Sequence, residues 1–128
     1  MEIYVDGSGS GSYGFIADDT VRVFFKANIT SNQAEYLTVI EALDWVKEKD
    51  VTILSDSQLI VNQLNHKFHI KDDKLRELAL KVWNLIETKG LNVEFKWIPR
   101  EENKAGKLIG STVYHVRNNE SNHIKHRF

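Results

Sequence analysis

Apolar and polar residues alternate with a period of two in several short stretches at the start of the chain. This alternation predicts strands at residues 2–6, 13–17 and 21–29, with a Gly/Ser-rich turn between the first two. The connections are short, so hairpins should join these strands and all three should be antiparallel to their neighbours.

Helical spacing and short apolar runs alternate along the rest of the chain. They predict helices at about 33–48, 57–65 and 73–88, strands at 51–55 and 91–97, and a final helix that begins around 102–104 and continues to about 117. Gly90 closes the third helix and Pro99 ends the last strand. The order of elements predicts an α/β fold, a five-stranded mixed sheet flanked by helices. Right-handed crossovers would bring the ends of the first and fourth strands together.

Composition narrows the class of protein without fixing its function. The 128 residues suit one domain, expected at 1–117, followed by a flexible tail at 118–128 that either frays in solvent or lies along a phosphate backbone. The absence of cysteine excludes disulfides and thiolate metal sites, and the five histidines lack the spacing of zinc ligands. With no leader and no apolar run long enough to span a bilayer, we expect a cytoplasmic monomer with no membrane association.

The net charge of −1 does not by itself indicate a nucleic-acid-binding protein. A bound metal would neutralise part of the acidity, however, and the basic residues could still gather on one face. Charge therefore leaves nucleic-acid binding open.

Three acidic residues lie at junctions between predicted elements, and each has an ordinary structural explanation. Asp6 precedes Gly7 and suits a turn. Glu35 follows Asn32 by three residues, which matches a capping box with Asn32 as N-cap. Asp56 lies between a strand and a helix, where an N-cap is common. Taken singly, these explanations are the more frequent ones.

The combination of the three favours a different interpretation. Helical spacing puts Glu35 on the apolar stripe of Val39, Ala42 and Val46, with no Lys or Arg on that stripe in the first two turns. An ionised carboxylate buried without a counter-charge is costly. If Asp6 and Asp56 lie at the ends of neighbouring strands, all three carboxylates converge, and a divalent cation would offset their repulsion.

The sequence motifs that contain these acids are similar to those of a known family. The motifs DGS, NQAE, SDSQ and WIPREENKAxxL occur in the same order as in ribonuclease H of type 1, and the resemblance covers roughly residues 2–110. The resemblance implies hydrolysis of the RNA strand of an RNA·DNA hybrid by two Mg²⁺ or Mn²⁺ ions, leaving 5′-phosphate and 3′-hydroxyl ends. It implies that Asp6 bridges both ions and that Glu35 and Asp56 hold the ion on the leaving-group side.

The chain departs from the family at the last catalytic acid, where it has Gly106. The ion that activates water would retain only Asp6 as a protein ligand. Glu101 and Glu102 match family positions that are not ligands, and no histidine occurs between Pro99 and Gly106. The 66–73 segment is also short where some members carry a basic protrusion.

The resemblance also implies substrate contacts. Thr30 and Asn32 match positions that seat a DNA phosphate, and Gly11, Asn32 and Gln58 match positions that read 2′-hydroxyls in the minor groove. Two alternatives remain open: a form that binds hybrids after catalysis was lost or deliberately removed, and another nuclease of the superfamily, such as a resolvase or exonuclease. The NQAE and SDSQ phrases favour type 1.

Overall fold

The alternating stretches at the start of the chain form an antiparallel meander in the computed structural model, which describes residues 1–107 and 109. β1 (Glu2–Gly7) pairs with β2 (Ser12–Ala17), and β2 pairs with β3 (Thr20–Phe25). This half of the sheet matches the prediction from hydrophobic alternation.

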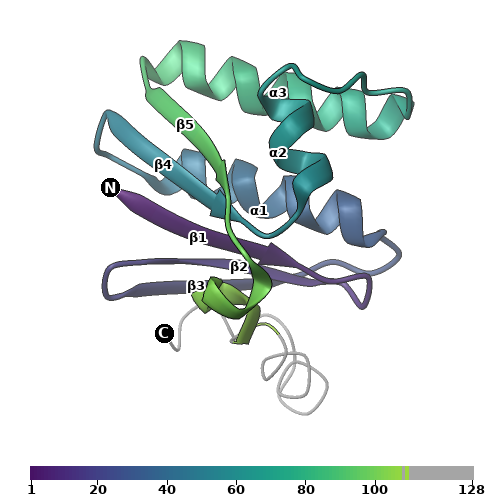
Figure 1. The fold of residues 1–128 in the computed structure, drawn as a ribbon, viewed down its shortest axis with the longest axis horizontal. Coiled ribbons are helices and arrows are strands. Elements are labelled where there is room, and N and C mark those ends of the chain that lie inside the picture. Colours follow the sequence, from purple (N-terminus) through teal and green to yellow (C-terminus); the bar gives the residue numbers. More distant parts are fainter. Residues whose placement is uncertain (108, 110–128) are drawn as a thin grey trace.

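The second half of the sheet is parallel. β4 (Asp50–Ser55) lies beside β1, and β5 (Asn92–Trp97) lies beside β4, which gives the order β3-β2-β1-β4-β5 (Figure 1). Because β1 and β4 run in the same direction, their carboxyl ends meet at one edge of the sheet, as predicted. This edge is where Asp6 and Asp56 lie.

Helices between the strands connect them and cover the sheet. α1 (Ser31–Trp45) packs against β1 and β2 on one face of the sheet and against α3 (Asp73–Lys89), while α2 (Gln58–Leu64) is short. The core between the sheet and these helices is made of aliphatic and aromatic side chains, among them Ile3, Val5, Phe15, Tyr36, Val39, Ala42, Leu43, Ile53, Val82 and Phe95.

A lysine joins the ends of two of these helices. The Nζ atom of Lys89, at the end of α3, donates to the backbone carbonyls of Leu43, Asp44 and Val46 at distances of 2.6–2.8 Å. Carbonyls at a helix C-terminus have no intrahelical partner and carry partial negative charge. The ammonium group of Lys89 therefore provides hydrogen-bond donors for the carbonyls at the end of α1 and links α3 to α1.

The N-caps differ from those expected. Thr30 caps α1, since its side chain accepts from the backbone N–H of Gln33 and forms a capping box with it, so Asn32 is the second residue of the helix. Ser57 caps α2, so Asp56 is not a cap. Asp6 lies within β1 and is not a turn residue. The ordinary structural roles considered for the three acids are therefore absent.

Two boundaries also differ from the prediction. β3 ends at Phe25 and not at residue 29, because its partner β2 begins at Ser12, which lies opposite Phe25, and Asn28 has a φ of 63°. α1 runs from Ser31 to Trp45 and not over 33–48.

After β5 the chain crosses to the other face of the sheet. A short 3₁₀ helix, η1 (Arg100–Glu102), precedes helical residues 104–107 and 109, and Ile109 packs against Val21 and Val23. The expected continuation of this helix to residue 117 and the expected tail at 118–128 lie outside the described residues. Within the described part of the chain, none of the helices is both long and apolar enough to cross a membrane.

Candidate metal centre and nucleic-acid site

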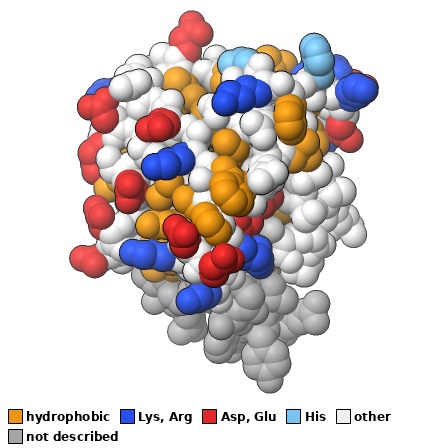
Figure 2. Space-filling model, in the orientation of Figure 1, with side chains coloured by type: hydrophobic (Ala, Val, Ile, Leu, Met, Phe, Trp, Pro, Cys, Tyr) orange, Lys and Arg blue, Asp and Glu red, His pale blue; other side chains and the backbone are white. Residues whose placement is uncertain are grey.

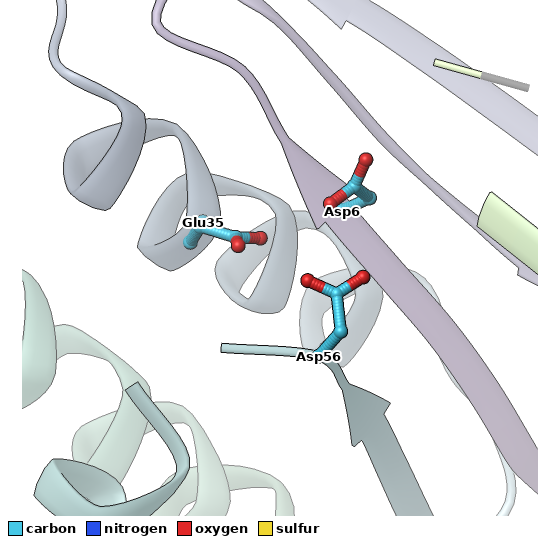
Figure 3. Close-up of side chains that lie close together, drawn as sticks. All are labelled: Asp6, Glu35 and Asp56. Atoms are coloured by element: carbon cyan, nitrogen blue, oxygen red, sulfur yellow. The ribbon is translucent and has the colours of Figure 1, made fainter. Parts of the chain in front are cut away.

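Three carboxylates converge at the edge where β1 and β4 end. Asp6 comes from β1, Asp56 from just beyond β4, and Glu35 from the second turn of α1, and all three carboxyl groups point toward a common centre (Figure 3). One oxygen from each lies within 4.8 Å of the others. The structure therefore brings together the three residues that the sequence pattern singled out.

A glycine allows this convergence by letting strand and helix approach closely. A Cβ atom at Gly7 would lie 2.5 Å from the carbonyl carbon of Ala34 and 2.6 Å from the backbone nitrogen of Glu35. Such distances are below van der Waals contact, so the position admits only a hydrogen. The close packing of β1 on α1 places Glu35 beside Asp6.

The three carboxylates repel one another in a buried setting. Asp6 and Glu35 have only 3% and 8% of their surface exposed. Burial, together with the charges of Asp6 and Asp56, raises the pKa of Glu35 from 4.5 to about 9. Burial and the charge of Asp56 raise the pKa of Asp6 from 3.8 to about 6.

Glu35 also has an unpartnered oxygen. Its Oε1 atom is buried and accepts no hydrogen bond among the described residues. A buried acceptor in this state is costly unless a proton or a cation is nearby. Three carboxylate oxygens that lie within 4.8 Å of one another are ligands of the kind that hard divalent cations prefer, so the donor set suits Mg²⁺ or Mn²⁺.

Sequence reasoning missed two residues that contact the cluster. Arg100, from η1, places its Nη1 atom 3.6 Å from Oδ1 of Asp56 and 3.9 Å from Oδ1 of Asp6. Asn103 is fully buried, and its Nδ2 atom donates to Oδ2 of Asp56 at 2.8 Å and to the carbonyl of Val5 at 2.9 Å. Both lie in the WIPREENKA phrase, but neither has a spacing that would indicate its role.

The backbone of Asp56 has a further fixed contact. The indole N–H of Trp97, at the end of β5, donates to the carbonyl oxygen of Asp56 at 3.1 Å. Together with the amide of Asn103, this bond fixes the position of Asp56 from two sides.

Gly106 lies beside the cluster, as the resemblance requires. A Cβ atom built there would be 3.8 Å from Oδ2 of Asp6 and 3.9 Å from Oδ2 of Asp56, which are ordinary contact distances. A Cβ atom at this position would therefore fit beside the cluster without a clash. Glu101 and Glu102 are exposed on η1.

The four candidate substrate-binding residues lie in the segments that surround this edge of the sheet. Thr30 is exposed at the start of α1, Asn32 is half-buried one turn before Glu35, and Gln58 is exposed as the first residue of α2. Gly11 has a φ of 104°, and a Cβ there would lie 2.5 Å from the carbonyl oxygen of Lys26. Its N–H donates to Ser8 and its carbonyl accepts from Lys26, which leaves one carbonyl lone pair.

The five-stranded mixed sheet with its flanking helices is the α/β fold of ribonuclease H. The sequence model of the family described as Reverse transcriptase-like matches residues 13–109, and the chain belongs to this family. The resemblance to ribonuclease H of type 1 is thereby confirmed at the level of fold and family.

Solved ribonuclease H structures superpose on most of the chain. The N-terminal RNase H domain of Rv2228c from Mycobacterium tuberculosis, solved as a fusion with maltose-binding protein, is 26% identical, with a TM-score of 0.78 over 91% of this chain and 95% of that one. LC11-RNase H1, isolated from compost by a metagenomic approach, is 26% identical, with a TM-score of 0.81 over 91% and 96%. The same protein in complex with an RNA/DNA hybrid is 25% identical, with a TM-score of 0.80 over 91% and 98%.

A curated relative has no described activity. The uncharacterized protein YpeP of Bacillus subtilis is 31% identical over 80 residues, which are 59% of this chain and 35% of YpeP. The match thus spans about a third of that relative's length.

Proposed function

We propose that this chain hydrolyses the RNA strand of RNA·DNA hybrids with the help of divalent metal ions, Mg²⁺ or Mn²⁺. The observation that carries the proposal is the convergence of Asp6, Glu35 and Asp56, with a buried oxygen of Glu35 left unpartnered. LC11-RNase H1, which has the same fold, has been solved with an RNA/DNA hybrid bound. Fold and cluster together favour nucleic-acid hydrolysis over a purely structural role.

In this proposal Asp6 would be a ligand of two divalent ions, and Glu35 and Asp56 would be ligands of the ion on the leaving-group side. Divalent ions in such a site polarise the phosphoryl oxygen and lower the pKa of bound water. Asn103 holds one oxygen of Asp56 and leaves the other directed at the centre. Arg100 adds a partly exposed positive charge at the mouth of the site, where a phosphate would arrive.

The surface charges suggest how a duplex would approach. Acidic side chains gather on the side of the molecule where the N-terminus lies (Figure 2), and they include Asp18, Asp19, Glu48, Asp50 and Glu94. The connection between α2 and α3 carries two exposed lysines, Lys67 and Lys71. Phosphates are repelled by the first region and attracted by the second, so the duplex would run across the ends of β1 and β4 toward α2.

Within this arrangement Thr30 and Asn32 supply polar groups at the N-terminus of α1, which suits a DNA phosphate. Gln58, at the start of α2, supplies an exposed amide that suits 2′-hydroxyls, and the resemblance assigns the backbone of Gly11, which is buried in this structure, to the same contacts.

Gly106 favours a second candidate function, a hybrid-binding protein that cleaves slowly or not at all. The position adjoins Asp6 and Asp56 but provides no ligand atom. Binding of a hybrid depends mainly on phosphate and groove contacts, so it would persist without that ligand.

The first prediction tests the metal site and the reaction together. Asp6→Asn should abolish Mn²⁺ binding in calorimetric titrations and abolish any single-turnover cleavage of a labelled hybrid, since Asp6 is the shared ligand. Asp19→Asn, which removes an exposed acid from the distant β2–β3 turn, is the matched control and should change neither. An unchanged Mn²⁺ titration in Asp6→Asn would contradict the proposed site.

A further inference from the structure

Exposed hydrophobic side chains gather near the carboxylate cluster. Among residues 1–107 and 109, the large hydrophobic side chains that are exposed are Phe25, Leu59, Phe68, Leu80 and Trp97. Leu80 lies in α3, whereas the other four lie in or beside the segments that hold the cluster and the candidate substrate-binding residues. Single exposed hydrophobic residues are common, but a group of them around one site is typical of a binding surface.

Three of these side chains adjoin residues that the proposed function assigns to the substrate or the metal. The ring of Phe25 lies beside Gly11, since a Cβ atom at Gly11 would be 2.9 Å from Cε1 of Phe25. Leu59 follows Gln58 in α2, which packs against β5. Trp97 is the last residue of β5. Apolar side chains therefore accompany the polar groups at this edge of the sheet.

Trp97 has a direct contact with one of the carboxylate residues. It ends the edge strand of the sheet and is paired with Ser55 in the β4–β5 ladder (Figure 1). Its indole N–H donates to the carbonyl oxygen of Asp56 at 3.1 Å, yet 42% of the residue is exposed. The hydrogen bond fixes the orientation of the ring, so an exposed aromatic surface is held beside the cluster before any substrate binds.

The position of this ring restricts the part of a substrate that it can meet. The proposed reaction cleaves the RNA strand at the carboxylate cluster, so the nucleotides beside Asp56 belong to that strand. In a duplex of A-like geometry the bases are stacked on one another, whereas the riboses are accessible in the wide, shallow minor groove. An aromatic ring next to Asp56 would therefore meet the C–H groups of a ribose.

We propose that the indole ring of Trp97 is a substrate contact, which packs against a ribose of the RNA strand beside the scissile phosphate. The inference rests on the proposed function, because it names a further residue that binds the same substrate. The ring supplies an apolar contact, while the amide of Gln58 is proposed to bind a 2′-hydroxyl. The two contacts together position the RNA strand over the cluster.

Two substitutions separate the ring of Trp97 from its N–H group. Trp97→Phe and Trp97→Leu both lose the hydrogen bond to Asp56, but only Trp97→Phe keeps an aromatic ring. Stopped-flow anisotropy measures the affinity of the full chain for a dye-labelled RNA·DNA hybrid in Mn²⁺, within seconds of mixing. We expect Trp97→Leu to bind the hybrid roughly five- to ten-fold more weakly than Trp97→Phe. Equal affinities of the two variants would overturn the inference.

Two controls accompany this comparison. Leu80→Ala removes an exposed hydrophobic side chain from α3 and should leave hybrid affinity unchanged. Calorimetric titration with Mn²⁺ alone should give the same affinity for Trp97→Phe and Trp97→Leu, since both lack the same N–H group. Different Mn²⁺ affinities of these two variants would mean that the ring acts through Asp56, and would overturn the substrate contact.

Tryptophan emission gives a second measurement that does not depend on the folding of Trp97→Leu. Hybrid binding should change the emission of the unaltered chain by covering an exposed indole. Most of this change should be lost in Trp97→Phe, whose remaining tryptophans, Trp45 and Trp83, are half-buried. An equal change in both proteins would overturn the inference and leave hybrid hydrolysis intact. Failure of both the unaltered chain and Gly106→Asp to bind the hybrid would refute the proposed function, and the inference with it.

Discussion

Gly106 is the residue at which one missing side chain has the largest chemical consequence. The position adjoins Asp6 and Asp56, and a Cβ atom there would be in ordinary contact with both. Loss of one preorganised electrostatic group should raise the barrier by about 3–5 kcal/mol, which corresponds to roughly 10²–10⁴ in rate. We predict that Gly106→Asp speeds single-turnover hybrid cleavage by about this factor, while hybrid affinity changes much less.

The metal dependence of the unaltered chain should also reflect the carboxylate ligand that is missing at Gly106. Mn²⁺ should support more turnover than Mg²⁺, because Mg²⁺ demands a more complete octahedral ligand set. If the unaltered chain already cleaves as fast as Gly106→Asp, another group, such as Glu102, must supply the missing ligand.

Glu35 gives a prediction about stability and pH in the presence of a chelator. The folded-state pKa values of Glu35 and Asp6, about 9 and about 6, exceed their ordinary values of 4.5 and 3.8, so the folded protein holds protons that the unfolded chain releases. Their contribution to stability is therefore full below about pH 4 and is lost as pH rises toward 9. We expect the free energy of unfolding to fall over this range by at least about 2 kcal/mol relative to Glu35→Gln.

Urea unfolding at several pH values, with a chelator present, measures this difference. With added Mn²⁺ the free energy of unfolding should instead rise with pH, because the metal displaces the protons and binds more tightly as pH rises. Parallel pH curves for the unaltered chain and Glu35→Gln would show that Glu35 titrates normally.

At the scale of single elements, the three hydrogen bonds from Lys89 to the end of α1 add to the packing between α1 and α3. Lys89→Met keeps most of the aliphatic stem but leaves three carbonyl groups without the ammonium. We predict a loss of about 2 kcal/mol in the free energy of unfolding, in line with hydrogen bonds to charged groups at a helix C-terminus.

Lys81→Met provides the comparison for this prediction. Lys81 is exposed on the same helix, α3, so its replacement should change stability by less than about 0.5 kcal/mol. Equal effects of the two substitutions in chemical denaturation would mean that the bonds from Lys89 contribute nothing specific.

The elements also show what sequence patterns can and cannot determine. Alternation and, for β4, a short apolar run located the five strands, and the stripe of Val39, Ala42 and Val46 placed Glu35 against the sheet, since these patterns are local. The cap of α1 was assigned wrongly because Thr30, Ser31 and Asn32 are all good caps, and the choice among them depends on where the preceding loop leaves β3.

The contacts of Arg100 and Asn103 could not be predicted for a different reason. They depend on the 3₁₀ turn after β5, which returns the chain to a strand about a hundred positions earlier, and nothing in the local spacing encodes that return. Asp6 and Asp56 were paired correctly because right-handed parallel crossovers restrict where strand ends meet.

At the scale of the whole molecule, the segregation of charge predicts how binding responds to salt and to the type of duplex. Affinity for an RNA·DNA hybrid should exceed that for duplex DNA and should fall steeply with salt, because phosphate contacts dominate. Thr30→Ala should weaken hybrid binding roughly three- to ten-fold for any sequence, as expected for one lost hydrogen bond to phosphate.

Thr30→Ser keeps the hydroxyl, and with it both the helix cap and the proposed phosphate contact, so it is the control and should bind hybrids like the unaltered chain. Fluorescence competition with hybrid and duplex DNA measures both effects. Equal affinity for the two duplexes would refute the assignment of Gly11, Asn32 and Gln58 to 2′-hydroxyl recognition.

The sheet order has a consequence for the way the protein is made. During synthesis β1, β2, β3 and α1 leave the ribosome before β4 exists, so the growing chain presents one whole side of β1 as an open edge with unpaired N–H and C=O groups. An open strand side of this kind can pair with a neighbouring nascent chain, so aggregation should be most favourable in the interval before β4 is synthesised.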